Sequence, residues 1–152
     1  MKKVSTILKS YVLIVLMMIF VGFSSFASIE RLSKKKVKAR LVGVWELVSF
    51  GNDDPDQQQA RLGQLKVFDQ DGSYTFLQVG SSGTVVAHQG TFRVKSDSTY
   101  VEDIEFATRQ NLRGVSSTVS YKFTSEEEVL VHGNVGDIIF HEKWRKVKLP
   151  RD

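Results

Sequence analysis

The feature that most constrains this fold is a series of short segments in which apolar and polar side chains alternate. About nine such segments follow one another at roughly ten-residue spacing, with turn residues between them and no sustained helical period. This pattern predicts an antiparallel, up-and-down all-β meander. The first segment begins with Gly43-Val44-Trp45 and the last contains Trp144-Arg145. We expect these two terminal strands to pair and to close a small β-barrel, a fold that commonly encloses a ligand.

Turn residues divide the segments. Pro55 and the aspartates around it predict an irregular polar loop over 52–59, with room for a short helical turn within 56–62. Glycine-containing turns are predicted at 69–72, 80–83 and 133–136, and a longer loop at 107–114. The predicted strands are 41–50, 65–68, 74–79, 84–88, 90–94, 99–106, 115–123, 129–132 and 138–149.

The first 27 residues have the three-part form of a secretory signal peptide. Lys2, Lys3 and Lys9 precede an uncharged apolar stretch over 11–23, and small residues at Ser25 and Ala27 suit cleavage before Ser28. The apolar stretch is short for a membrane span, which needs about 20 residues. We therefore expect an exported protein, periplasmic or secreted.

A basic run follows the leader, and we predict an N-terminal arm without regular structure over 28–40. Six lysines and arginines lie between Arg31 and Arg40. This excess of positive charge behind the apolar stretch leaves an uncleaved membrane anchor as the alternative to cleavage. If the leader is cleaved, the arm is either a solvated linker or makes a weak contact with anionic lipid headgroups.

The charge balance of the folded part argues against nucleic acid as a partner. Residues 1–40 hold nine of the 21 basic residues and one of the 17 acidic residues, so 41–152 contain 12 basic and 16 acidic residues. The domain over 41–150 is therefore mildly acidic in spite of the basic chain. The absence of cysteine from the sequence excludes disulfides, thiolate metal sites and a cysteine nucleophile.

Two glutamates fall on strand faces that are otherwise apolar. Glu102 shares a face with Tyr100, Ile104 and Phe106, and Glu142 shares one with Ile138, Phe140 and Trp144. A carboxylate in such a place must be paired, hydrogen-bonded or protonated, because an unpaired buried charge is costly. These glutamates are either structural ion pairs or polar anchors in a cavity. The candidate ligand contacts are Glu102, Tyr100, Tyr121, Arg109 and Glu142.

A set of short motifs, in this order along the chain, resembles a lipocalin-like (calycin) family of secreted bacterial proteins, the domain of unknown function 4488. The motifs are Gly43-Val44-Trp45, the turn 68–72 with Tyr74, Gly90-Thr91-Phe92, Tyr100-Val101-Glu102 and Trp144-Arg145. The resemblance implies a barrel of about eight to ten strands. It also implies that Trp45 closes the barrel floor and that Arg145 packs across its ring, with Gly43 and Trp144 beside them.

Three hypotheses for function follow. The leading one is a non-enzymatic exported barrel that holds a small hydrophobic or amphipathic ligand, and a lumen above about 300 Å³ would support it. The second is a structural or interaction module of the cell envelope whose barrel is filled by its own side chains. The third is a calycin-type enzyme that uses Glu102 with Glu142 or with a histidine.

No motif predicts a cofactor or a metal. His88, His132 and His141 fall on separate predicted strands without a metal-binding spacing. The chain has no G-x-S-x-G nucleophile motif, and the glycines at 80 and 83 lack the lysine of a phosphate-binding loop. We therefore predict no catalytic residues.

Overall fold

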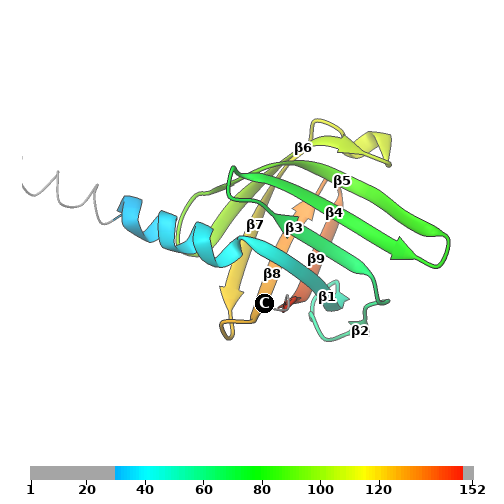
Figure 1. The fold of residues 1–152 in the computed structure, drawn as a ribbon, viewed down its shortest axis with the longest axis horizontal. Coiled ribbons are helices and arrows are strands. Elements are labelled where there is room, and N and C mark those ends of the chain that lie inside the picture. The colour runs from blue at the N-terminus through cyan, green and yellow to red at the C-terminus, as the bar shows by residue number, and fades with distance from the viewer. Residues whose placement is uncertain (1–29, 149–152) are drawn as a thin grey trace, which may run out of the picture.

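The computed structural model describes residues 30–148, which form one helix and a nine-stranded antiparallel sheet (Figure 1). The predicted signal peptide over 1–27 lies outside the described residues. Within 30–148, no helix is both long and apolar enough to span a lipid bilayer. After the helix over 30–41, the elements are β1 (Gly43–Gly51), β2 (Gln58–Gln59), β3 (Gln64–Phe68), β4 (Ser73–Gly80), β5 (Gly83–Val94), β6 (Thr99–Ala107), the short 3-10 helix η1 (Gln110–Leu112), β7 (Ser116–Phe123), β8 (Glu128–Val135) and β9 (Ile138–Lys146).

The sheet closes on itself as the sequence predicts. Strands β3 to β9 pair in chain order, and β1 pairs with β3 on one side and with β9 on the other. Trp45 lies opposite Lys146, and Leu47 lies opposite Trp144. The short β2 pairs with the end of β1. The result is an eight-stranded, up-and-down, lipocalin-like barrel with one extra strand, which confirms the predicted fold class.

Several strand boundaries differ from the prediction by a few residues, and two of the larger differences involve glycine. The segments 84–88 and 90–94 form the single strand β5, because a bulge between Gln89 and Gly90 lets pairing with β6 continue. The predicted turn over 133–136 is wrong, because β8 runs through Val135. Gly133 belongs to that strand because the Phe140 ring covers it, where a Cβ would lie 2.9 Å from Phe140 Cζ.

The arm predicted without regular structure is wrong over 30–41, which is a helix (Figure 1). Its first turn carries an ion pair between Glu30 and Lys34 at 2.7 Å. Its last carbonyls accept hydrogen bonds from the barrel. Trp45 Nε1 donates to Leu41 O at 2.7 Å, and Lys146 Nζ donates to Arg40 O at 3.0 Å. The helix therefore depends on contacts at its end, which no periodic pattern reveals. The helical turn considered within 56–62 is also absent, since β2 lies there.

Aromatic side chains fill the end of the barrel next to the helix, which we call the closed end. The Phe68 ring packs against those of Phe92 and Tyr100 at centroid distances of 4.8 and 5.8 Å. Trp45 packs against Phe123 at 6.2 Å. The small cavity between Trp45, Phe68 and Tyr100 has a volume of only about 10 Å³. This half of the barrel is thus packed by its own residues.

One predicted inward residue points outward. Phe106 was expected to share a face with Glu102 and Ile104. The bulge that shifts the β5–β6 register reverses the alternation after Ile104, so that Ala107 is buried and Phe106 is exposed. The Phe106 ring lies under the guanidinium of Arg113, at 5.0 Å.

Candidate functional site

The opposite half of the barrel contains a cavity with two adjoining chambers. The outer chamber has a volume of about 270 Å³ and the inner chamber about 70 Å³. Together they fall at the small end of the range for ligand pockets, roughly 300–1,000 Å³. Both chambers are lined by Phe76, His88, Val135, Phe140 and Glu142.

The outer chamber is apolar on most of its wall. Ala87, Leu112 and Ile138 add apolar surface to the side chains that both chambers share. Its polar lining comes from Gln78, Thr108 and Arg109. The loop that carries η1 supplies Thr108, Arg109 and Leu112, and the β8–β9 hairpin supplies Val135 and Ile138. A small molecule with an apolar body fits this environment better than a strongly polar one.

A buried ion pair lies at the inner end of the cavity. Lys66 Nζ on β3 donates to Glu102 Oε1 on β6 at 2.8 Å, and the two side chains are only 10% and 5% exposed. Lys66 Nζ also lies 5.4–5.9 Å from four aromatic ring centroids. Aromatic faces attract cations, so these rings and the carboxylate together replace the water that the ammonium loses. The four rings belong to Phe68, Tyr74, Phe76 and Trp144.

Glu142, whose side chain is half-buried, is the second carboxyl of the site. Its Oε2 accepts a hydrogen bond from Trp144 Nε1 at 2.8 Å. Burial raises the pKa of Glu142 above its ordinary range, and the nearby Lys66 ammonium partly opposes that shift. Among residues 30–148, Glu142 forms no ion pair. Its charge is therefore less compensated than that of Glu102.

His88 supplies a neutral polar group to both chambers. Its Nδ1 lies 3.1 Å from the hydroxyl of Tyr74, and its ring packs against Phe76 at 5.0 Å. Burial lowers the pKa of His88 to about 4, so the imidazole is uncharged at neutral pH. Burial also raises the pKa of Tyr74, which keeps its proton. Because the tyrosine can donate to Nδ1, the imidazole proton is then on Nε2.

The structure brings some of the predicted ligand contacts together and separates others. Glu102 and Glu142 both line the inner chamber, and Arg109 lies in the wall of the outer one. Tyr100 is buried next to Glu102 and lines neither chamber. Tyr121 lies at the closed end, where its hydroxyl donates to Ser96 O at 3.0 Å. Its position on an inward face was predicted correctly, but the face meets the packed half of the barrel.

Sequence reasoning did not include Lys66 or His88 among the ligand contacts, and it assigned Trp144 to the barrel floor alone. Strand alternation contained a signal for Lys66, because it lies two residues before Phe68, which faces the interior. His88 was considered, with the other histidines, for a metal site and as a catalytic partner of Glu102, but not as a ligand contact. The other two histidines meet on the outer surface, where the His132 and His141 rings pair across β8 and β9 at 4.2 Å.

The predicted barrel floor agrees with the structure at Trp45 and Trp144, which line one small cavity at the closed end, but not at Arg145. Trp45 is buried at the closed end. Arg145 does not cross its ring, since the guanidinium points outward to Glu46 at 3.3 Å. Because side chains alternate along a strand and Trp144 faces inward, Arg145 must face outward and Lys146 inward. Lys146 accordingly lies over the Trp45 ring, with Nζ 5.2 Å from its centroid.

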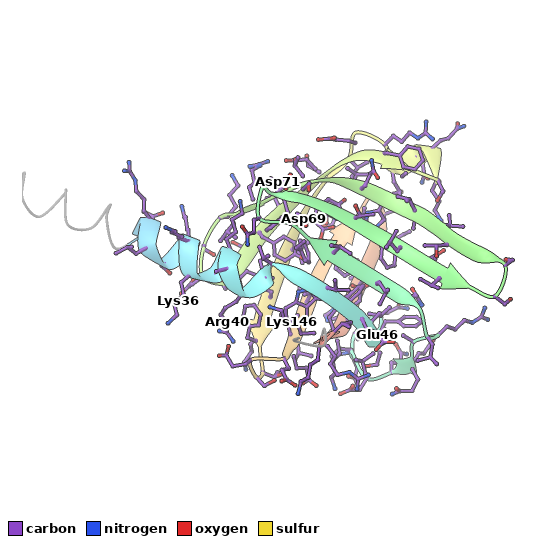
Figure 2. The ribbon with its side chains drawn as sticks, viewed as in Figure 1. Lys36, Arg40, Glu46, Asp69, Asp71 and Lys146 are labelled. Atoms are coloured by element: carbon purple, nitrogen blue, oxygen red, sulfur yellow. The ribbon has the colours of Figure 1, made fainter. Side chains whose placement is uncertain are left out.

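The helix supplies a second cation at the closed end. The guanidinium of Arg40 stacks 3.9 Å from the centroid of Phe123, the ring that packs on Trp45. Figure 2 shows Arg40 and Lys146 together where the helix meets the barrel. Gly43 leaves room for Lys146, because a Cβ there would lie 2.9 Å from Lys146 Cε. Trp144, predicted to be part of the floor, lines both the small cavity at the closed end and the inner chamber.

Comparisons with known proteins extend this description. The solved structures that are similar to part of this chain include the following two. A single-site mutant of the fluorescent protein UnaG is 11% identical, with 73% of this chain and 99% of that chain covered and a TM-score of 0.40. The bovine lipocalin allergen Bos d 2 is 16% identical, with 72% and 75% covered and a TM-score of 0.40. No curated protein sequence matches the chain.

One family model matches most of the chain, over residues 40–152, and thus covers the whole barrel. The match confirms the resemblance drawn from the short motifs between Gly43 and Arg145. The chain therefore belongs to the family described as Domain of unknown function (DUF4488).

Proposed function

We propose that the protein is an exported, non-enzymatic binding protein whose barrel holds one small amphipathic molecule. Its apolar part would occupy the outer chamber, and its polar end would reach the inner chamber beside Glu142 and His88. The observation that carries this proposal is the division of the barrel into a solid aromatic half and a half with a cavity. A barrel with only a structural role gains stability from filling both halves.

The buried charges support a binding role over a purely structural one. Replacing a buried ion pair by well-packed apolar residues is often neutral or stabilising, so such a pair is weak evidence for a stabilising role. Lys66, Glu102 and Glu142 thus lie where apolar side chains would give a more stable core. Retaining costly polar groups beside a cavity is expected where a ligand makes use of them.

The arrangement of the two glutamates argues against an enzyme. Two glutamates that act as general acid and base must both be free to exchange protons with a substrate. Glu102 Oε1 accepts a hydrogen bond from Lys66 Nζ at 2.8 Å, so this carboxylate is already engaged in an ion pair. Only Glu142 is left to exchange a proton, so the two glutamates do not form a working pair.

Export is the part of the proposal that depends on the leader. The mature chain is proposed to begin at or near Ser28, so that the helix over 30–41 lies close to its N-terminus. Sequencing the N-terminus of the processed protein tests this. Recovery of the intact chain in the membrane fraction would instead support an uncleaved anchor. The exposed Arg31, Lys35 and Lys36 are consistent with a weak contact with anionic lipid in either case.

Native mass spectrometry of the protein purified from its own host tests the binding function. A co-purified small molecule is expected in the wild type and in Val85→Trp, a control at an exposed position of β5. Ala87→Trp, two residues along the same strand, places an indole in the outer chamber and should exclude the molecule. A ligand-free wild type, or equal occupancy of both variants, would argue against binding in this cavity.

A further inference from the structure

The charges around the inner chamber do not balance when both glutamates are ionised. Six side chains with ionisable groups face or adjoin this region: Lys66 from β3, Tyr74 from β4, His88 from β5, Tyr100 and Glu102 from β6 and Glu142 from β9. The Tyr74 and Tyr100 hydroxyls and the His88 imidazole are neutral at pH 7. With both glutamates ionised, two carboxylates face a single ammonium group.

Glu142 is the carboxyl without a cation. Lys66 Nζ is bound to Glu102 Oε1, and Trp144 Nε1 supplies a neutral donor to Glu142 Oε2. Glu142 Oε1 accepts no hydrogen bond from any residue in 30–148, and the side chain lines both chambers. A carboxylate in a low-dielectric site gains most from a group that both donates a hydrogen bond and carries positive charge.

The rings around Glu142 favour the same kind of ligand. Phe76, Phe140 and Trp144 line the inner chamber with it, and the Phe76 and Trp144 rings lie edge to face at 5.9 Å. The faces of aromatic rings attract cations and repel anions. Lys66 Nζ already lies near two of these rings, so the chamber tolerates an ammonium group.

We propose that the polar end of the ligand is an organic ammonium group, which binds Glu142 Oε1 while an apolar chain fills the outer chamber. This inference rests on the proposed binding function and specifies its ligand class. A primary ammonium has three donors, one for Glu142 Oε1 and others for cavity water, and it restores the charge balance of the inner chamber. A carboxylate ligand would instead face two glutamates there. The cation that it could use, Arg109, is in the wall of the outer chamber.

The two tryptophans of the chain provide a direct test by proton–nitrogen correlation NMR. The Trp144 indole N–H bonds Glu142, so its resonance reports on the inner chamber. The Trp45 indole N–H bonds Leu41 O at the closed end and serves as an internal reference. Hexylammonium, hexan-1-ol and hexanoate are titrated into the isotope-labelled protein at pH 7. They share one apolar chain and differ in their polar end.

We expect hexylammonium to shift the Trp144 resonance, leave the Trp45 resonance in place and bind at least about tenfold more tightly than hexan-1-ol. Glu142→Gln keeps the side-chain size and an oxygen acceptor for Trp144 Nε1, and should lose that tenfold preference while still binding the alcohol. Glu105→Gln, at an exposed position on β6, is the matched control and should bind all three ligands as the wild type does.

Equal or tighter binding of hexanoate or hexan-1-ol at the Trp144 site would overturn the ammonium proposal and leave the binding function intact. If none of the three compounds moves the Trp144 resonance, the ammonium site is also wrong. The binding function is then judged separately, by native mass spectrometry of the host-purified protein. The ligand series on the wild type decides the question even if Glu142→Gln does not fold.

Discussion

Removing Lys66 should destabilise the protein strongly, because it leaves the buried Glu102 carboxylate without its cation and removes the ammonium near Glu142. Lys66 is 10% exposed and Glu102 5%, so water cannot replace the lost partner. Breaking one side of a buried pair costs about 3–5 kcal/mol, and we expect that range for Lys66→Met. Glu102→Leu should cost less, since Glu142 remains close enough to attract the orphaned ammonium. The free energy of unfolding of folded domains is only about 5–15 kcal/mol, so Lys66→Met should remove a large fraction of it.

The double variant Lys66→Met with Glu102→Leu measures the interaction between these two side chains apart from their contacts with other residues. An apolar pair of similar volume is often neutral or stabilising, so the double variant should recover to within about 1 kcal/mol of the wild type. Urea unfolding of all four proteins, followed by tryptophan fluorescence and by circular dichroism, gives the coupling free energy. If the two single changes are additive, or if Lys66→Met unfolds at the wild-type urea midpoint, the buried pair is not as described.

Three further predictions concern the floor and the free carboxyl. In urea unfolding, Trp45→Phe should lower the free energy of unfolding by about 1–3 kcal/mol, because the Leu41 carbonyl loses its buried donor. Trp45→Ala, which also removes the ring, should lower it by about 3–5 kcal/mol. Equal losses in the two variants would show that the indole N–H contributes nothing. Arg145→Lys should shift the melting temperature little, since its ion pair with Glu46 is on the surface. Because folding raises the pKa of Glu142, ionisation of Glu142 costs stability as pH rises through and above the ordinary glutamate range. Glu142→Gln should therefore be more stable than the wild type at pH 7, with a difference that shrinks on acidification; a pH-independent difference in thermal melts would contradict this.

The barrel was predictable because one rule, the alternation of side chains along a strand, gives both the strands and their faces. Glu102, Glu142 and Tyr121 all face the interior, as alternation requires. Alternation also excludes Arg145 from the floor once Trp144 faces inward, so Lys146 could have been identified from the sequence. The resemblance placed the basic residue one position too early.

Other parts of the site depend on register and on contacts between distant segments, which alternation does not report. Tyr121 and Glu102 both face inward, yet Tyr121 lies in the packed half and Glu102 lies in the cavity. Alternation predicts that a side chain faces inward, but not how far along the barrel axis it lies. Apart from Gly90 on the partner strand, no feature of the sequence predicts the bulge that turns Phe106 outward. Lys66 was overlooked because a lysine is almost never buried unless it is paired.

The floor that a ligand meets is the buried ion pair, and Trp45 lies beyond it. Lys66 Nζ lies near rings of both halves of the barrel, with Phe68 on the closed side and Trp144 on the cavity side. The aromatic closed half supplies stability that offsets the cost of these charges, and it holds the ammonium away from water. A ligand that reaches this floor must lose the water around its polar end. On the proposed binding function, polar groups that Glu142 can compensate would bind best, and this carboxyl, rather than the volume of the cavity, would determine which ligands the barrel accepts.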